Sequence, residues 1–137
     1  MITAEFVTAG KATFTVESVT GHYYTYRITH KEANGNFSES WLISLLTGPD
    51  NTSSYTYLGK LNPSTGAVTL TAGSKFTDNS TPVRVIRWAL QIIWGYKELP
   101  AGYNIHHEGR CGRCNRLLTV PSSIEGGIGP ECAKAIG

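Results

Sequence analysis

Residues 22–28, His-Tyr-Tyr-Thr-Tyr-Arg-Ile, decide the fold of this chain. Successive side chains of a strand point to opposite faces of its sheet. Tyr24, Tyr26 and Ile28 would therefore share one face, and the residues between them would share the other. This alternation predicts a strand with one buried face.

Four further segments have strand-like patterns, and turn-forming residues separate them. Short connections of this kind favour an antiparallel meander over parallel units joined by helices. The turn formers are Thr20-Gly21, Asn34-Gly35-Asn36, Gly48-Pro49-Asp50-Asn51 and Asn62-Pro63-Ser64-Thr65-Gly66. The predicted strands cover residues 12–16, 41–46, 55–59 and 67–71.

One helix is predicted after the strands. Residues 79–81 offer capping side chains, and Pro82 suits the first turn, where its missing N–H costs nothing. Residues 99–102, Leu-Pro-Ala-Gly, would end the helix. The side chains expected to pack on the sheet recur at helical spacing: they are Val85, Ala89, Ile92, Ile93 and Tyr96.

These elements predict an α+β protein with an antiparallel β-meander and one packed helix, and three cysteines near a histidine pair in the tail add a predicted C-terminal Cys3His zinc knuckle. We expect two units, a sheet-and-helix domain over residues 1–102 and a zinc-binding module over residues 103–137. The chain has 137 residues and a net charge of +2. It lacks a recognisable signal peptide or a long apolar stretch, so a cytoplasmic protein without a membrane partner is expected.

All three cysteines lie in the C-terminal module. Cys111 and Cys114 enclose two residues, the spacing of a metal knuckle, and Cys132 follows after a connection long enough to bring the chain back. A structural zinc takes four ligands, and Cys3His is one of its common sets. The alternatives are three buried thiols, or one disulfide with a spare thiol, but an odd cysteine count beside a His pair favours metal.

His106 and His107 both stand close enough to supply the fourth ligand. We expect His107, because the three residues between it and Cys111 let the ring turn back over a tight Glu108-Gly109 turn. His106 stays as the alternative. Zinc would be structural, since about 10–16 kcal/mol of binding free energy can order a segment with few large apolar side chains.

The tail is similar to a known module. Cys-x-x-Cys, then Arg116-Leu-Leu-Thr-x-Pro-x-Ser123, then Gly127-Ile-Gly-Pro-x-Cys132 resembles a short zinc-ribbon-like module of unknown function found in small tailed-phage proteins. The resemblance covers about residues 105–133. It implies a metal site at His107, Cys111, Cys114 and Cys132, and it implies no particular activity. The whole chain also resembles uncharacterised phage proteins of this size.

No catalytic set is recognisable in the sequence. His106-His107-Glu108 followed by Cys-x-x-Cys shares features with the zinc-deaminase signature. However, only two residues separate Glu108 from Cys111, whereas that chemistry needs the two halves on separate helices. We therefore expect a protein that is not an enzyme.

Arginines suggest nucleic acid as the partner. Residues 82–137 carry seven Lys/Arg against four Asp/Glu, whereas residues 1–81 carry five against six. Arginine with neighbouring aromatic rings suits phosphate contact and base stacking. The alternative is that these arginines only balance the charge of the zinc-thiolate group. The candidate contacts are Arg110, Arg113 and Arg116 around the knuckle, with Arg84 and Arg87 on the helix.

A host protein is the second possible partner. In this interpretation the chain is a phage accessory or anti-defence protein that binds and inhibits a host component. Its support is the phage resemblance and the many tyrosines, which are favoured at protein interfaces. The alternative is that about half of those tyrosines pack in the core of a twisted sheet and are not available to a partner. Nuclease sensitivity and salt dependence of binding distinguish the two partners.

Overall fold

A computed structural model describes residues 2–50, 53–107, 109–114 and 127. Its main element is a six-stranded antiparallel sheet with strand order β5-β4-β3-β2-β1-β6. The strands are β1 (Lys11–Glu17), β2 (Tyr23–Lys31), β3 (Ser40–Leu46), β4 (Tyr55–Leu61), β5 (Val68–Thr69) and β6 (Asn104–His107). Two helices complete the described fold, α1 (Ala4–Val7) and α2 (Thr81–Ile93).

The predicted α+β class and the antiparallel meander are confirmed. Strands β1 to β5 follow one another across the sheet, and every neighbouring pair is antiparallel. Alternation in β2 places Tyr26 and Ile28 in the core, both fully buried, with Tyr24 partly buried beside them. The pattern of one buried and one less buried face therefore holds for this strand.

The sequence did not predict β6. This strand returns after α2 and pairs with β1 at the far edge of the sheet, with Val16 opposite Ile105 and Phe14 opposite His107. Ile105 is buried. The first residues of the predicted C-terminal module are thus part of the sheet.

Ala89, Ile92 and Ile93 of α2 are buried as predicted, but the end of the helix and part of its buried face differ from the prediction. The helix ends at Ile93, and Gly95 follows with a φ of 88°, a left-handed conformation that suits glycine and ends the helix before Tyr96. Tyr96 is 65% exposed instead of packed on the sheet. Val85 is only partly buried, whereas the prediction omitted three residues that are fully buried: Val83, Ile86 and Leu90.

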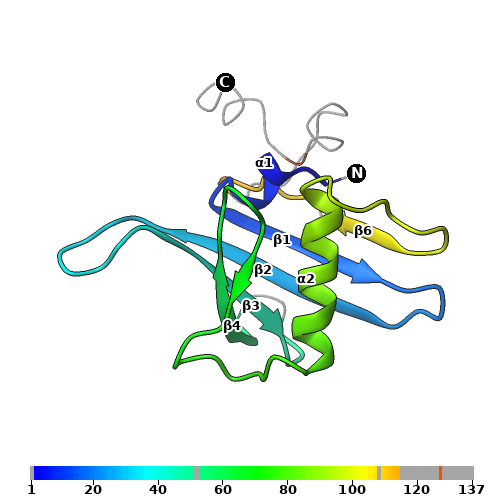
Figure 1. Cartoon of the computed structure of the whole chain (residues 1–137), viewed down its shortest axis with the longest axis horizontal. Helices are drawn as coiled ribbons and strands as arrows, with labels where there is room; N and C mark the ends of the chain where they lie inside the picture. Colours follow the sequence, from blue (N-terminus) through cyan, green and yellow to red (C-terminus); the bar gives the residue numbers. More distant parts are fainter. Residues whose placement is uncertain (1, 51–52, 108, 115–126, 128–137) are drawn as a thin grey trace.

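Figure 1 shows α2 lying across one face of the twisted sheet, with its first turn at the opposite end of the molecule from α1. The buried side chains of α2 join those of β1 to β5 in one core. The loop between β2 and β3, drawn in cyan, projects from the body of the molecule. No helix in the described part of the chain is long and apolar enough to cross a membrane.

Short α1 was also absent from the prediction. Thr3 caps it by accepting a hydrogen bond from the Phe6 N–H at 3.2 Å. Phe6 and Val7 are buried in the core. The helix therefore fixes Phe6 beside the first residues of β1.

Candidate functional site

The two histidines of β6 lie on opposite faces of the strand. His107 shares a face with buried Ile105 and is partly buried, whereas His106 is exposed. The His107 ring packs against Phe6, with ring centroids 5.4 Å apart. His107 thus faces α1, and His106 faces away from it.

Residues 111–114 form a turn attached to the start of β1. Cys111 is fully buried and Cys114 is exposed. The Arg113 N–H donates a hydrogen bond to the Cys111 sulfur, with nitrogen and sulfur 3.4 Å apart. Gly112 anchors the turn on both sides, because its carbonyl accepts from the Lys11 N–H at 2.6 Å and its N–H donates to the Gly127 carbonyl at 2.7 Å.

Phe6 brings this turn and His107 together. A Cβ atom added at Gly112 would lie 2.7 Å from the Phe6 ring and 2.9 Å from the Phe6 carbonyl oxygen. A Cβ atom added at Gly127 would also collide with the ring. Backbone at both glycines therefore approaches the same phenyl ring that His107 contacts, and only glycine permits this approach.

A hydrogen bond from Gly109 occupies one nitrogen of the candidate histidine ligand. The Gly109 N–H donates to His107 Nδ1 at 2.9 Å. A zinc ion on Nδ1 would take the lone pair that this N–H now uses. A zinc ion on Nε2 would leave the ring proton on Nδ1, which could then no longer accept. Metal binding by His107 through either nitrogen therefore requires this hydrogen bond to open.

The predicted ligand set is only partly described by the structure. His107, Cys111 and Cys114 belong to the described residues, whereas Cys132 lies outside them. Among the residues that the structure describes, no group of three His, Cys, Asp or Glu side chains is arranged to hold a metal ion. The zinc site stays a prediction, although the chemistry of the donors suits this metal.

The four predicted arginines that the structure describes do not form one surface. Arg110 and Arg113 are exposed and flank buried Cys111 and Gly112, and Arg116 lies outside the described residues. Arg84 is exposed in the first turns of α2. That end of the helix lies at the opposite end of the molecule from α1, on which the knuckle turn packs (Figure 1).

Arg87 makes contacts within the fold. Its guanidinium forms an ion pair with Asp78 at 2.8 Å and donates a hydrogen bond to the Val68 carbonyl at 3.1 Å. These contacts join α2 to β5 and to the loop that precedes the helix. Arg87 thus differs from Arg84, with which it was grouped as a nucleic-acid contact.

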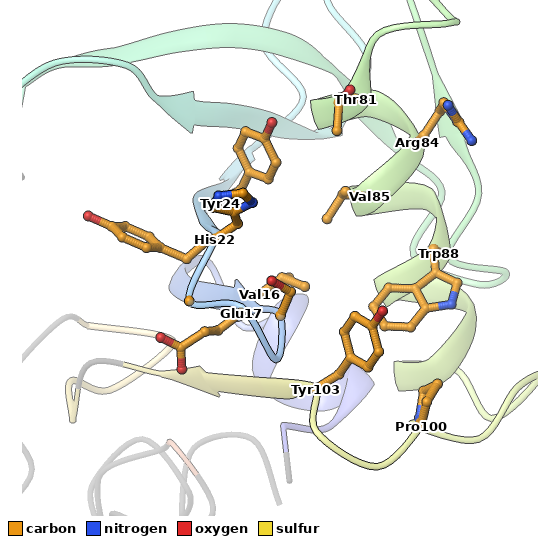
Figure 2. Close-up of a pocket in the computed structure, with 13 residues that line it drawn as sticks. Val16, Glu17, His22, Tyr24, Thr81, Arg84, Val85, Trp88, Pro100 and Tyr103 are labelled. Atoms are coloured by element: carbon orange, nitrogen blue, oxygen red, sulfur yellow. The ribbon is translucent and has the colours of Figure 1, made fainter.

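The structure contains a cavity of about 1010 Å³ that the sequence did not predict. It lies between the end of the β1–β2 hairpin and α2, and Figure 2 shows Tyr24, Val85, Trp88 and Tyr103 around it. Residues from four separated segments line it, so no single motif could have identified it. The clustered tyrosines and Trp88 were the only sequence signal.

Comparison with known proteins adds one finding. A family model described as a family of unknown function (DUF6011) matches residues 106–137. The matched segment begins inside β6 and includes both candidate histidines and all three cysteines. No curated protein and no solved structure matches the chain significantly.

Proposed function

We propose that this chain is a non-catalytic zinc-containing protein of the phage type that binds nucleic acid. A structural zinc would be held by His107, Cys111, Cys114 and Cys132. Four protein ligands leave no open coordination position, so the metal would stabilise the fold instead of acting as a Lewis acid.

The observation that carries the zinc proposal is the environment of Cys111. Its sulfur is buried and accepts a backbone N–H from Arg113, and the same turn packs on the phenyl ring that His107 contacts. A backbone N–H that points at a sulfur can brace that sulfur when it binds a metal ion, because hydrogen bonding to the charged form stabilises it. The turn thus supports zinc binding more strongly than the spacing of the cysteines alone.

The nucleic-acid proposal is supported by the arginines next to this turn. Arg110 and Arg113 are exposed on either side of the buried Cys111-Gly112 pair. Arginine binds phosphate through several planar donors and keeps its charge. Residues 82–137 also carry the positive excess of the chain, with seven Lys/Arg against four Asp/Glu.

Zinc content and oligonucleotide binding test the two parts separately. Elemental analysis should find about one zinc per chain, because one ion satisfies the four proposed ligands. Cys111→Ser and Cys132→Ser should each abolish this content. Full zinc occupancy in either variant would reject the metal site.

Binding is measured with a labelled single-stranded oligonucleotide over a range of salt concentrations. Changing Arg110, Arg113 and Arg116 together to Glu should abolish binding, because phosphate contacts supply most of the salt-dependent affinity. The matched control changes three exposed lysines, Lys31, Lys60 and Lys75, to Glu. It makes the same change in net charge and should retain most of the affinity. Equal losses in both variants would show that only net charge matters.

One observation favours the alternative of a host-protein partner. Phe37 is 77% exposed in the loop that projects between β2 and β3 (Figure 1). Exposed aromatic side chains are common anchors of protein interfaces. Capture of a specific host protein by the zinc-loaded chain, lost in Phe37→Ser and unaffected by nuclease, would favour this alternative.

A further inference from the structure

The aromatic cavity lies between the β1–β2 hairpin and α2, and the loop before β6 closes one side of it. Its walls come from the end of β1, the start of β2, the first three turns of α2 and the loop before β6. Val19 in the β1–β2 turn touches the backbone at Gly102, so the two loops meet. With a volume of about 1010 Å³, the cavity is at the upper end of the range for ligand pockets.

Aromatic rings dominate the cavity. Trp88 and Tyr103 meet edge to face, with ring centroids 5.3 Å apart and an interplanar angle of 64°. Tyr103 is 39% exposed, and the Trp88 ring is partly buried against the core. Figure 2 shows Tyr24 across the cavity from them and Val85 pointing into it. Flat rings and hydroxyl groups therefore face the cavity.

Among the described residues that line the cavity, Glu17 and Arg84 carry charge and lie at its rim, and the His22 imidazole lies beside Tyr24. Figure 2 shows the Glu17 carboxylate and the Arg84 guanidinium on opposite sides, both turned away from its centre. Helix α2 begins on the same side of the rim as Arg84, and the first turn of this helix contains no acidic residue. The Ser80 hydroxyl donates to the Thr77 carbonyl at 2.7 Å instead of capping the helix. This side of the rim is therefore positive, both from Arg84 and from the N-terminal end of the helix dipole.

We infer that this cavity accepts an unstacked base of single-stranded nucleic acid. The base would lie against Trp88 and Tyr103, and its phosphate would face the rim formed by Thr81 and Arg84. A flat ring joined to an anion matches the aromatic side chains of the interior and the positive Arg84 side of the rim. This inference rests on the proposed function and names a base-binding site that is separate from the knuckle arginines.

Base stacking is tested by removing the rings. Binding of a labelled oligothymidine of about 12 nucleotides is measured by fluorescence anisotropy, and quenching of tryptophan fluorescence reports contact with the ring. Tyr103→Ala should weaken binding about 5- to 150-fold, the range for loss of one stacked base. Tyr96→Ala is the matched control, since Tyr96 is exposed and lies outside the cavity, and it should bind like the unchanged chain.

Trp88 needs a conservative variant because its ring also packs on the core. Trp88→Phe keeps most of this packing and should abolish the quenching while the chain stays folded. Arg84→Gln should reduce the slope of log affinity against log salt by about 0.7, the value for one single-strand phosphate contact. Lys97→Gln, which removes an exposed charge outside the cavity, should leave the slope unchanged.

The outcomes distinguish failure of the base-binding site from failure of the proposed nucleic-acid binding. If the unchanged chain binds and both Tyr103→Ala and Trp88→Phe bind equally well, the base-binding site is rejected and the proposed function stands. If the unchanged chain binds no oligonucleotide at any salt concentration, both are rejected. A nuclease-insensitive host protein that is captured by the unchanged chain and lost in Tyr103→Ala would show that the cavity binds protein instead.

Discussion

Phe6 connects the beginning of the chain to its C-terminal segment through a single ring. The ring is 1% exposed and contacts His107, and the backbone at Gly112 and Gly127 passes so close that a methyl group would collide with it. Any side chain at Gly112 must therefore displace either the ring or the turn that holds Cys111.

Replacing Gly112 with Ala should destabilise the protein by about 1–3 kcal/mol, the usual cost of overpacking a rigid contact. The loss arises because the added methyl group would lie 2.9 Å from the Phe6 carbonyl oxygen, which is backbone and cannot rotate away. Urea unfolding measures the free-energy change. Gly73→Ala is the control, because its added methyl group makes only ordinary contacts, 3.6 Å at the nearest. Equal stability of the two variants would contradict the close approach.

The two histidines should differ in their effect on zinc. Replacing His107 with Ala should reduce zinc affinity about 10-fold or more, as expected for loss of a ligand, whereas His106→Ala should leave it nearly unchanged. The reason is that His107 lies on the face of β6 that packs on Phe6, and His106 lies on the exposed face. Competition with a chromophoric chelator measures the affinity.

Zinc should also change the Gly109 amide, which now donates to His107 Nδ1. Its NMR resonance should shift on zinc addition in the unchanged chain and in His106→Ala. An amide that keeps its position while zinc binds would exclude His107 as a ligand and move the site to His106.

Among the elements, α2 and β5 are joined by Arg87 as well as by the packing of the shared core. Arg87→Gln should lower the free energy of unfolding by about 0.5–1.5 kcal/mol, mainly through loss of the hydrogen bond to the Val68 carbonyl. The ion pair with Asp78 is largely exposed and adds little. Arg84→Gln is the control and should leave stability within about 0.5 kcal/mol, as for most surface changes. Thermal unfolding of both variants should therefore show a lower midpoint for Arg87→Gln alone.

The long elements could be predicted from the sequence, as could short β5, whereas α1 and β6 could not. Alternation identified β1 and β2, in which one face is more buried than the other, and β3 was identified as a more continuous apolar run. Four-residue α1 and β6 are too short for periodicity to detect, and their burial depends on partners far along the chain. In α2, Ala89, Ile92 and Ile93 are buried as predicted, but Tyr96 was included although Gly95 ends the helix before it.

The candidate metal ligands could be proposed from spacing because three of them lie within eight residues of sequence, His107 to Cys114. The aromatic cavity could not be predicted, since its walls meet only through the pairing of β1 with β6 and the packing of α2. Trp88 and Tyr103 are in contact although a helix end and a loop separate them. Contacts of this kind follow from the tertiary arrangement alone.

At the scale of the whole molecule, Tyr26 makes stability depend on pH. Burial raises the pKa of its hydroxyl well above the ordinary value of 10.0, and Tyr24 adds to the shift. Its hydroxyl also donates to the Pro82 carbonyl at 2.7 Å, which ties β2 to α2. The folded protein therefore holds this proton at a pH where the unfolded chain releases it.

The free energy of unfolding should fall as pH rises above about 10, by about 1.4 kcal/mol per pH unit from this group. The sign follows because the unfolded chain then binds fewer protons than the folded one. Denaturant unfolding between about pH 8 and about pH 11 measures the slope, because this range includes the ordinary tyrosine pKa of about 10. Tyr26→Phe should remove this part of the slope, whereas exposed Tyr96→Phe should not. An unchanged slope in Tyr26→Phe would assign the effect to other groups.

The pairing of β1 with β6 sets an order of events during synthesis on the ribosome. Strand β1 emerges early, but the strand that covers its outer edge emerges only with residues 104–107, and the backbone that closes over Phe6 follows at residues 112 and 127. Until then a nascent chain exposes an open strand edge next to a phenyl ring, a combination that promotes self-association. Fragments that stop after residue 102 should therefore aggregate through this edge, and chaperone binding to the nascent chain should continue until β6 has emerged.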